Sequence, residues 1–454
     1  MLILPRVTLI ALCLLYLIVT LSSPTKAALR EPKLTGPRKL PLSLNQAIEL
    51  ALKNNRNLQT ARRSLTTAAS AYRAAKGGYF PQIRGSVSSS HSLSNQLEAF
   101  PRVVNRWSGG FDISLDMPLD LSGAIGRSVQ QALIRLLDTK ARYVLASQEL
   151  VVKVYTQYYE VLRTRETMII DRALVEQTQE QLRIAQERLK AGRVPEVDVL
   201  TASVQLDNAN QTMKADEGAY ENALAALRNT LVLDQQLEII PTDKLTYIPE
   251  TFEYQNCVRE AVQNRLEMQT ARLSLESAKI SLKSTYDSYL PSLNISGGWD
   301  YNVTGRNPAE AIEERPKGPS WNITARINVP IFIFDGGVTR ESKVQALTSI
   351  EQAEANLHQT REDIELEVKS EVINQKNALE RVNIVKNSIK LARESLKIEE
   401  LRYRMGLSSY LKVTNAQQNL RTAELNLLNA IIQYNLSKER LYQALGRALV
   451  TVGD

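Results

Sequence analysis

The residues of this sequence that could do chemistry are few and widely separated. The chain has two histidines, His91 and His358, and no spacing of histidine, cysteine and carboxylate residues that is typical of a metal site. It also lacks a glycine-rich loop of the kind that binds phosphate. Asp112 and Asp116 fall on the polar side of an alternating stretch, where water is the expected partner. The sequence therefore predicts no catalytic residue, no cofactor and no metal, and it does not favour an enzyme.

The charge of the chain is a small positive excess. The net charge is +7, and it falls to +5 when Arg6 and Lys26 are removed with an N-terminal signal. The basic residues are spread along the chain and form no run that suggests nucleic acid. We therefore expect no nucleic-acid partner.

Residues 1–27 have the features of a secretory signal peptide. Arg6 gives a weakly positive start, Val7–Leu21 is apolar, and Thr25-Lys26-Ala27 is an acceptable cleavage site. The apolar run is shorter than the roughly 20 residues that a span needs, which argues against an uncleaved anchor. Since Cys13 lies in this run, the mature chain keeps one cysteine, Cys257, which can form no intramolecular disulfide. We expect Cys257 to be a buried helix residue.

The sequence contains the same unit twice. LQTARRSL at Leu58–Leu65 resembles MQTARLSL at Met268–Leu275, and GYFPQIRGS at Gly78–Ser86 resembles SYLPSLNIS at Ser288–Ser296. Gly192 and Gly406 also correspond. A repeated pattern of this length indicates one architecture built from two copies. The predicted organisation is a signal peptide (1–27), a first repeat (28–233), a linker (234–251), a second repeat (252–446) and a tail (447–454).

Each copy predicts the same order of elements. A first helix, Ser43–Lys76 or Phe252–Ser288, precedes two strands and a long helix without Gly or Pro, Arg127–Ala191 or Val338–Met405. After the glycine comes a further helix, Glu196–Leu233 or Ser408–Leu445. At ~1.5 Å per residue a long helix spans about 100 Å, which suits two shorter helices stacked end to end beside it. The spacing of Val382, Val385, Ile389, Ala392 and Leu396 is typical of a coiled-coil seam.

The predicted strands cover about 79–96, 105–120, 289–304 and 320–334. Their residues alternate between apolar and polar, so that each strand has an apolar and a polar face. A soluble sheet with one face on a core is one interpretation, but the flanking helices are too long to fold back as its cover. A membrane barrel is the other, with these side chains toward lipid: Trp107, Phe111, Ile113, Leu115, Leu293, Ile295, Trp299, Ile323, Ile327 and Val329.

Four strands cannot close a barrel, and open sheet edges are not tolerated in lipid. The chain must therefore oligomerise, and three copies give 12 strands, within the known range. The predicted fold is therefore mainly α with a small transmembrane β portion.

Several of these features together resemble one family. They are the signal peptide, the duplicated helix–strand–strand–long helix–helix unit, the Tyr-Phe-Pro and Tyr-Leu-Pro strand starts, and the R-Y-x-x-G motif at Arg402–Gly406 followed by Ala416-Gln417. This combination resembles the TolC family of outer-membrane efflux proteins. The resemblance implies a homotrimer with a 12-stranded barrel on a long α-helical coiled-coil tunnel. The barrel lies in the outer membrane of a Gram-negative bacterium, in contact with outer-membrane lipid, and the tunnel is a long periplasmic extension. It also implies a periplasmic adaptor and an inner-membrane pump as partners.

The resemblance also assigns roles to the residues after the two glycines. In TolC-like members, acidic residues six and nine positions after the second glycine narrow the pore; here they are Lys412 and Asn415. The corresponding positions after the first glycine are Asp198 and Thr201. The resemblance implies a latch between Tyr403 and Asp198, although Ser408 replaces the family's basic partner. The turn residues expected to meet the adaptor are Gly192, Arg193, Gly406, Leu407 and Ser408.

The function that we expect is passive export of small molecules or a secreted protein through this tunnel. The alternative is a periplasmic coiled-coil scaffold or adaptor that never spans a membrane. The substitution Trp107→Asp or Ile327→Asp, on the apolar face of a strand, distinguishes the two. A scaffold should tolerate it, whereas a membrane barrel should fail to insert because it needs that face to be apolar.

Overall fold

The structure is a computed structural model, and it describes residues 39–96, 102–307, 319–331 and 335–447. The predicted signal peptide and residues 448–454 of the predicted tail lie outside these ranges. The described residues fall into two compact units, one that consists of 39–40 with 236–238 and one that contains the remainder. The second unit contains the helices and the larger sheet.

The order of elements in the two copies agrees with the duplicated unit. The first copy has α2 (Leu44–Asn54), α3 (Arg56–Gly77), β2 (Gln82–Gln96), β3 (Arg102–Leu119), α4 (Ala124–Lys190) and α5 (Glu196–Leu231). The second has α6 (Tyr254–Asn264), α7 (Leu266–Ser284), the 3-10 turn η1 (Asp287–Tyr289), β5 (Ser292–Gly305), β6 (Ser320–Asn328), α9 (Val338–Arg404) and α10 (Tyr410–Ala444). None of the described helices is both long and apolar enough to cross a membrane.

The first helix of each copy is broken, and the prediction of one continuous helix was wrong. The breaks fall at Asn55 and Arg265, which both have extended backbone. The Asn55 side chain accepts hydrogen bonds from the backbone N–H groups of Asn57 and Leu58, and it donates to the Thr230 carbonyl at 3.2 Å. Asn55 thus caps the start of α3 and reaches the end of α5, a use of asparagine that competes with a continuous helix.

The four longer strands form one antiparallel sheet in the order β2-β3-β5-β6. Apolar residues lie opposite one another across the strands: Ile113 pairs with Trp299, and Trp299 pairs with Trp321. The last strand ends at Asn328, earlier than predicted, because Pro330 has no N–H to donate to a ladder. Val329 therefore lies just beyond the strand, and residues 332–334 of the predicted strand lie outside the described ranges.

The structure also contains a small two-stranded sheet that the pattern of alternating apolar and polar residues did not predict, and one of its strands lies in the predicted linker. β1 (Lys39–Leu42) pairs with β4 (Glu238–Pro241). Each strand has four residues, which is too short to display a reliable period-two pattern.

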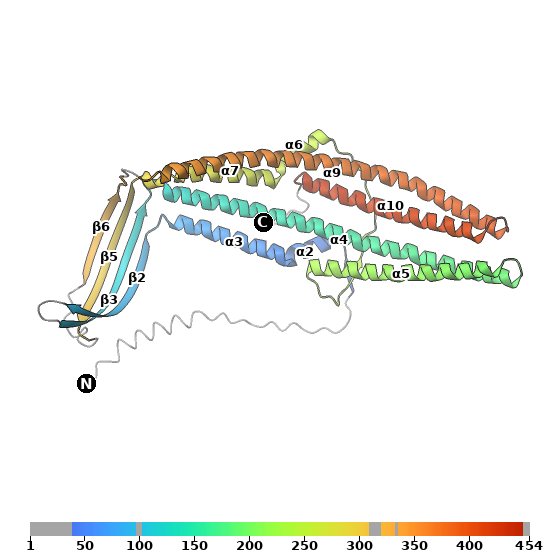
Figure 1. Ribbon diagram of the computed structural model, residues 1–454, viewed down its shortest axis with the longest axis horizontal. Coiled ribbons are helices and arrows are strands. Elements are labelled where there is room, and N and C mark those ends of the chain that lie inside the picture. Colours follow the sequence, from blue (N-terminus) through green and yellow to red (C-terminus); the bar gives the residue numbers. More distant parts are fainter. Residues whose placement is uncertain (1–38, 97–101, 308–318, 332–334, 448–454) are drawn as a thin grey trace. The chain divides into compact units, whose positions relative to one another are not determined.

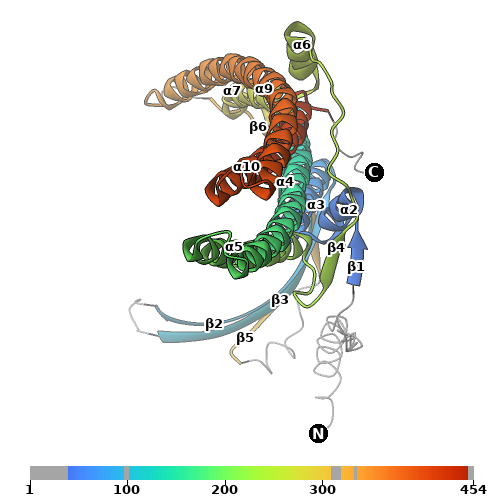
Figure 2. The same ribbon diagram turned by 90° about the vertical axis from the view of Figure 1, so that its right-hand side faces the viewer.

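The shorter helices pack along the long ones. α3 and α5 both contact α4, while α6, α7 and α10 contact α9, as Figures 1 and 2 show. The ends of α6, α7 and α10 meet on α9 in a core that includes Cys257, Ile364 and Leu441. Cys257 is buried in a helix, as predicted. Val382 and Leu396 of the predicted seam are also buried, in contact with residues of α10.

Candidate functional site

The strands carry an exposed apolar face. Trp321 and Ile327 of β6 are 74% and 63% exposed, and Phe111, Ile113, Leu115, Trp299, Ile323 and Val329 are also exposed. Trp107, Leu293 and Ile295 are half-buried on the same face. Neighbouring rings touch across the strands: Phe111 meets Trp299 edge-on with ring centroids 5.9 Å apart. All ten predicted lipid-facing residues therefore carry side chains that are open or partly open to the surroundings.

The opposite face of the sheet is polar. Ser86 donates to Asp112, and the Asn294 amide donates to Asp116 at 2.5 Å. The hydroxyls of Ser90 and Ser108 are 2.7 Å apart. These cross-strand bonds satisfy polar groups that face away from the apolar side, which is the pattern of a strand between lipid and water.

Two aspartates anchor the long helices where they leave the strands. Asp120 accepts hydrogen bonds from the N–H groups of Ile125 and Gly126, at 3.1 and 2.9 Å. Asp335 accepts them from Gly337 and Thr339, at 2.9 and 3.1 Å. Hydrogen bonds from Thr339 and Gly337 hold the pKa of Asp335 well below its ordinary value. Each carboxylate binds otherwise unpaired N–H groups at the positive end of a helix.

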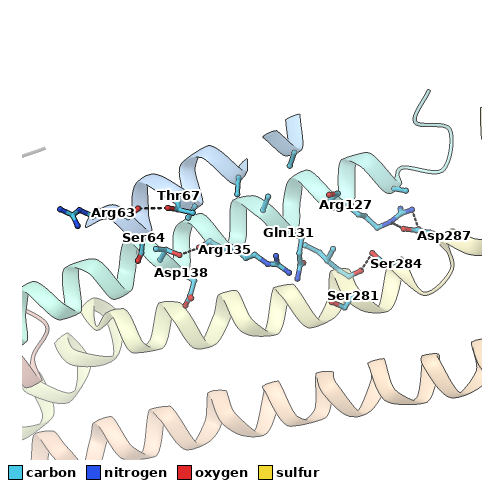
Figure 3. Close-up of a pocket in the computed structure, with 18 of the residues that line it drawn as sticks. Arg63, Ser64, Thr67, Arg127, Gln131, Arg135, Asp138, Ser281, Ser284 and Asp287 are labelled. Carbon is cyan, nitrogen blue, oxygen red and sulfur yellow. Dashed lines mark hydrogen bonds and ion pairs between the residues drawn. The ribbon is translucent and has the colours of Figure 1, made fainter. Parts of the chain in front are cut away.

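Next to the sheet, α3, α4 and α7 line a groove of about 1080 Å³ whose walls combine hydroxyl and charged side chains with alanine. Figure 3 shows Ser64 and Thr67 of α3, Gln131 of α4 and Ser281 and Ser284 of α7 around it. The groove also contains an ion pair between Arg127 and Asp287, whose Nε and Oδ2 atoms are 3.3 Å apart. Hydroxyl and charged groups give this wall the character of a water-facing surface.

The two glycine turns join α4 to α5 and α9 to α10, and we call these helix pairs the first and second hairpins. Gly192 and Gly406 have φ values of +67° and +77°, as the predicted tight turns require. The hydrogen bonds are equivalent: Arg193 N–H binds the Arg188 carbonyl at 2.9 Å, and Leu407 N–H binds the Arg402 carbonyl at 2.8 Å. Gly192, Arg193, Gly406 and Leu407 are exposed, and Ser408 is half-buried.

The tips of the two hairpins pack together. One buried cluster contains Ala185 of α4, Ala202 of α5, Leu396 and Tyr403 of α9, and Tyr410, Val413 and Ala416 of α10. Tyr403 is 8% and Tyr410 3% exposed, with ring centroids 6.0 Å apart. All four helices of the tip thus share one core.

The predicted pore residues lie around this core. Lys412 and Asn415 are exposed on α10, while Asp198 and Thr201 are half-buried on α5. The Thr201 hydroxyl donates to the Val197 carbonyl of its own helix at 2.7 Å. Within the described chain the buried Tyr403 hydroxyl has no hydrogen-bond partner, so this conformation does not contain the predicted hydrogen bond between Tyr403 and Asp198.

A different residue joins the hairpins here. Arg188 of α4 donates from Nη1 to the Tyr403 carbonyl and from Nη2 to the Arg404 carbonyl, both at 3.1 Å. Its guanidinium also lies 4.5 Å from the centre of the Tyr403 ring. Ser408 turns back to its own hairpin and donates to Glu399 at 2.6 Å.

Comparison with known proteins decides the family. The model of the outer membrane efflux protein family matches residues 47–231 and 257–447, most of the chain. The chain belongs to this family. It is 23% identical to the outer membrane protein TolC of Vibrio cholerae over 406 residues, covering 89% of this chain and 90% of that protein. It is 25% identical to the probable efflux pump outer membrane protein TtgC of Pseudomonas putida, covering 89% and 83%.

Solved structures give the same fold. The CmeC outer membrane channel of Campylobacter jejuni superposes with a TM-score of 0.75 at 20% identity, covering 90% of this chain and 87% of that one. The resemblance to the TolC family is thereby confirmed. This outer membrane efflux protein belongs in the outer membrane of a Gram-negative bacterium with a long periplasmic extension, and it is a channel protein by family.

A second polar joint lies farther from the turns of this efflux protein. Arg421 of α10 binds both carboxylate oxygens of Asp171 on α4, with Nη2 and Oδ2 2.9 Å apart. Burial opposes ionisation of Asp171, but the hydrogen bonds from Arg421 and Asp216 outweigh it and lower its pKa. Burial raises the pKa of the adjacent Asp216 to about 6, and the Asp171 carboxylate adds to this rise. Asp171 is therefore the member of the pair that loses its proton at the lower pH.

Sequence reasoning missed Arg188, Tyr410 and the Asp171–Arg421 pair. One signal for Arg188 was present, because Arg188 and Arg402 each stand four positions before a turn glycine. The signal does not distinguish them: Arg402 pairs with Glu399 of its own helix at 3.3 Å, whereas Arg188 reaches the other repeat.

Proposed function

We propose that this efflux protein is a homotrimer whose 12 strands close an outer-membrane barrel above a helical tunnel. The observation that carries the proposal is the four-stranded sheet with an apolar face. Its outer strands, β2 and β6, each have one edge without a partner strand in the described chain. An edge in lipid leaves backbone groups without hydrogen bonds, at a cost of several kcal/mol each. Pairing β6 of one copy with β2 of the next removes every edge.

The helices support the same assembly. Val197, Leu200 and Val204 form an exposed apolar stripe on α5, and Ile384, Leu391 and Ile398 form another on α9. Apolar residues that are aligned on one helix face and exposed in a monomer suit burial against another protein. In the trimer they meet neighbouring copies, while polar walls such as that of Figure 3 line water.

We infer that transport is passive export. The chain has no nucleotide-binding loop and therefore no energy source of its own. An inner-membrane pump supplies the cargo, small molecules or a secreted protein, through a periplasmic adaptor. The adaptor meets the exposed turns at Gly192, Arg193, Gly406, Leu407 and Ser408. Lys412 and Asn415, with Asp198 and Thr201, line the constriction behind them.

The test is insertion of the trimer and its conductance. The purified protein should migrate as a heat-sensitive trimer on denaturing gels and conduct ions in planar bilayers. Ile327→Asp should abolish insertion, because a charge on the lipid face is costly. The matched control is Thr324→Asp on the polar face of the same strand, which should insert normally. A soluble wild-type monomer, or full tolerance of Ile327→Asp, would support the periplasmic scaffold instead.

A further inference from the structure

The last residues of α9 are held by a cation from the other repeat. Arg188 lies four residues before Gly192, and Tyr403 and Arg404 lie just before Gly406. The final carbonyls of a helix lack intrahelical partners and form its negative end. A guanidinium that donates to two of them therefore gains both hydrogen bonds and a favourable charge interaction. Its contact with the face of the Tyr403 ring adds a cation–π attraction.

We propose that Arg188 is the positioning residue that ties the two hairpins of a protomer at the tunnel tip, and that the tunnel opens when this tie is released. The inference rests on the proposed function, since it needs a tunnel whose tip can close. The tie consists of the hydrogen bonds from the Arg188 side chain to the α9 carbonyls and its contact with the Tyr403 ring.

The hydroxyl of Tyr403 is not the group that the tie uses. It is buried with no hydrogen-bond partner in the described chain, and the neighbouring Tyr410 hydroxyl is in the same condition. What Tyr403 contributes is its ring, between Arg188 and Tyr410, and its carbonyl. Removing the hydroxyl alone should therefore leave the tie intact.

Arg188 is also the polar link between α4 and the second hairpin that lies nearest the turns. The other described links begin at Gln177, which donates to Glu400 at 2.9 Å, and at Asp171 with Arg421. At ~1.5 Å per residue, Gln177 and Asp171 lie about 20 and 30 Å along α4 from Gly192, on the side away from the turn. Without Arg188 the tips keep only the apolar contacts around Ala185, Ala202 and Val413. The tips can then separate while the body of the protomer stays joined.

The experiment compares single-channel conductance of purified trimers in planar bilayers. Arg188→Ala should raise the conductance at least two-fold without changing the temperature at which the trimer dissociates on gels. The matched control is Arg183→Ala, an exposed arginine of the same helix that pairs only with Glu180 and Glu187 of α4. It should conduct like wild type, as should Tyr403→Phe. Arg188→Lys keeps the charge but loses the paired donors, so it should fall between wild type and Arg188→Ala.

Each other outcome has a distinct meaning. Unchanged conductance in both Arg188→Ala and Arg188→Lys would overturn the tie and leave the proposed function standing. Opening by Tyr403→Phe to the level of Arg188→Ala would also overturn it, in favour of a hydroxyl bond between Tyr403 and Asp198. A wild-type protein that neither forms trimers nor conducts would refute the proposed function and the inference with it.

Discussion

Replacing Arg421 with methionine should destabilise the protein more than the loss of an exposed ion pair does. The Asp171 carboxylate that Arg421 binds is 1% exposed and lies between α4, α5 and α10. Methionine fills a similar volume but donates no hydrogen bond. The substitution therefore leaves a buried carboxylate with no cation bound to it and with the Asp216 carboxyl beside it.

The magnitude follows from the burial of the pair. Removing one partner of a buried ion pair costs about 3–5 kcal/mol, because the remaining charge stays in a poor solvent. The reference is Arg393 with Glu424, a pair between α9 and α10 at 3.4 Å whose arginine side chain is 67% exposed. An exposed pair of this kind contributes about 0–1 kcal/mol. Arg421→Met should thus cost several times as much stability as Arg393→Met.

The loss should also depend on pH. Without Arg421, burial and the Asp216 carboxyl act together to raise the pKa of Asp171 above its unfolded value. The penalty is then fully present above the raised pKa, and protonation relieves it as the pH falls. Arg421→Met should therefore be closer to wild type at pH 5 than at pH 8. Asp171→Asn in the same chain removes the stranded charge and should restore part of the stability at pH 8.

The assay is guanidinium unfolding of the detergent-solubilised protein, followed by helical circular dichroism at both pH values. The midpoint is compared for wild type, Arg421→Met, Arg393→Met and the Asp171→Asn/Arg421→Met double variant. Equal shifts for Arg421→Met and Arg393→Met would refute the buried-pair argument. An Arg421→Met shift that is the same at pH 5 and pH 8 would refute the role of an ionised Asp171.

Three further predictions concern other parts of the chain. Burial raises the pKa of Glu439 to about 7, so its charge costs stability above that pH and the cost disappears toward pH 4.5; Glu439→Gln should raise the melting temperature at pH 8 and change it little at pH 4.5. Gly406→Ala should lose about 1 kcal/mol, because φ is +77° there, whereas Gly218→Ala inside α5 should gain about 1 kcal/mol by helix propensity, both measured by the same unfolding assay. Lys412→Asp should shift the reversal potential in a salt gradient toward cation selectivity, and an equal shift from Lys390→Asp, farther from the turns, would argue against Lys412 at the constriction.

The elements that could be predicted are those whose pattern is local. A strand with one apolar and one polar face must alternate along its own length, so residues such as Phe111, Ile113 and Leu115 mark β3 without any knowledge of its neighbours. The long helices are likewise marked by the absence of Gly and Pro up to Gly192 and Gly406. The breaks in the first helix of each copy could not be predicted, because neither Asn55 nor Arg265 is a residue type that prevents a helix. Their extended backbone depends on partners elsewhere, such as the Thr230 carbonyl, 175 positions from Asn55.

The contacts at the tip could not be predicted either, because they also join residues that are far apart in the sequence. Arg188 and the Tyr403 carbonyl are 215 positions apart, and Arg421 and Asp171 are 250 apart. A family pattern supplied Tyr403 and Asp198 as partners because it transfers residue types by position. It could not supply the conformation of this chain, in which the Tyr403 hydroxyl is buried alone and the ring faces Arg188.

The duplication itself explains why the tie at the tip runs in one direction. Arg188 and Arg402 occupy the same position relative to their glycines, so identical copies would allow each hairpin to bind the next in the same way. The position after them differs: Leu189 stands in the first repeat where Tyr403 stands in the second. Leucine offers no aromatic face, so Arg402 finds no ring on the first hairpin and binds Glu399 of its own helix. In the proposed trimer the contact within a protomer therefore differs from the contact between protomers. The tip of the proposed trimer therefore has three Arg188 contacts, one in each protomer, rather than six. The tunnel opens when these three equivalent contacts break.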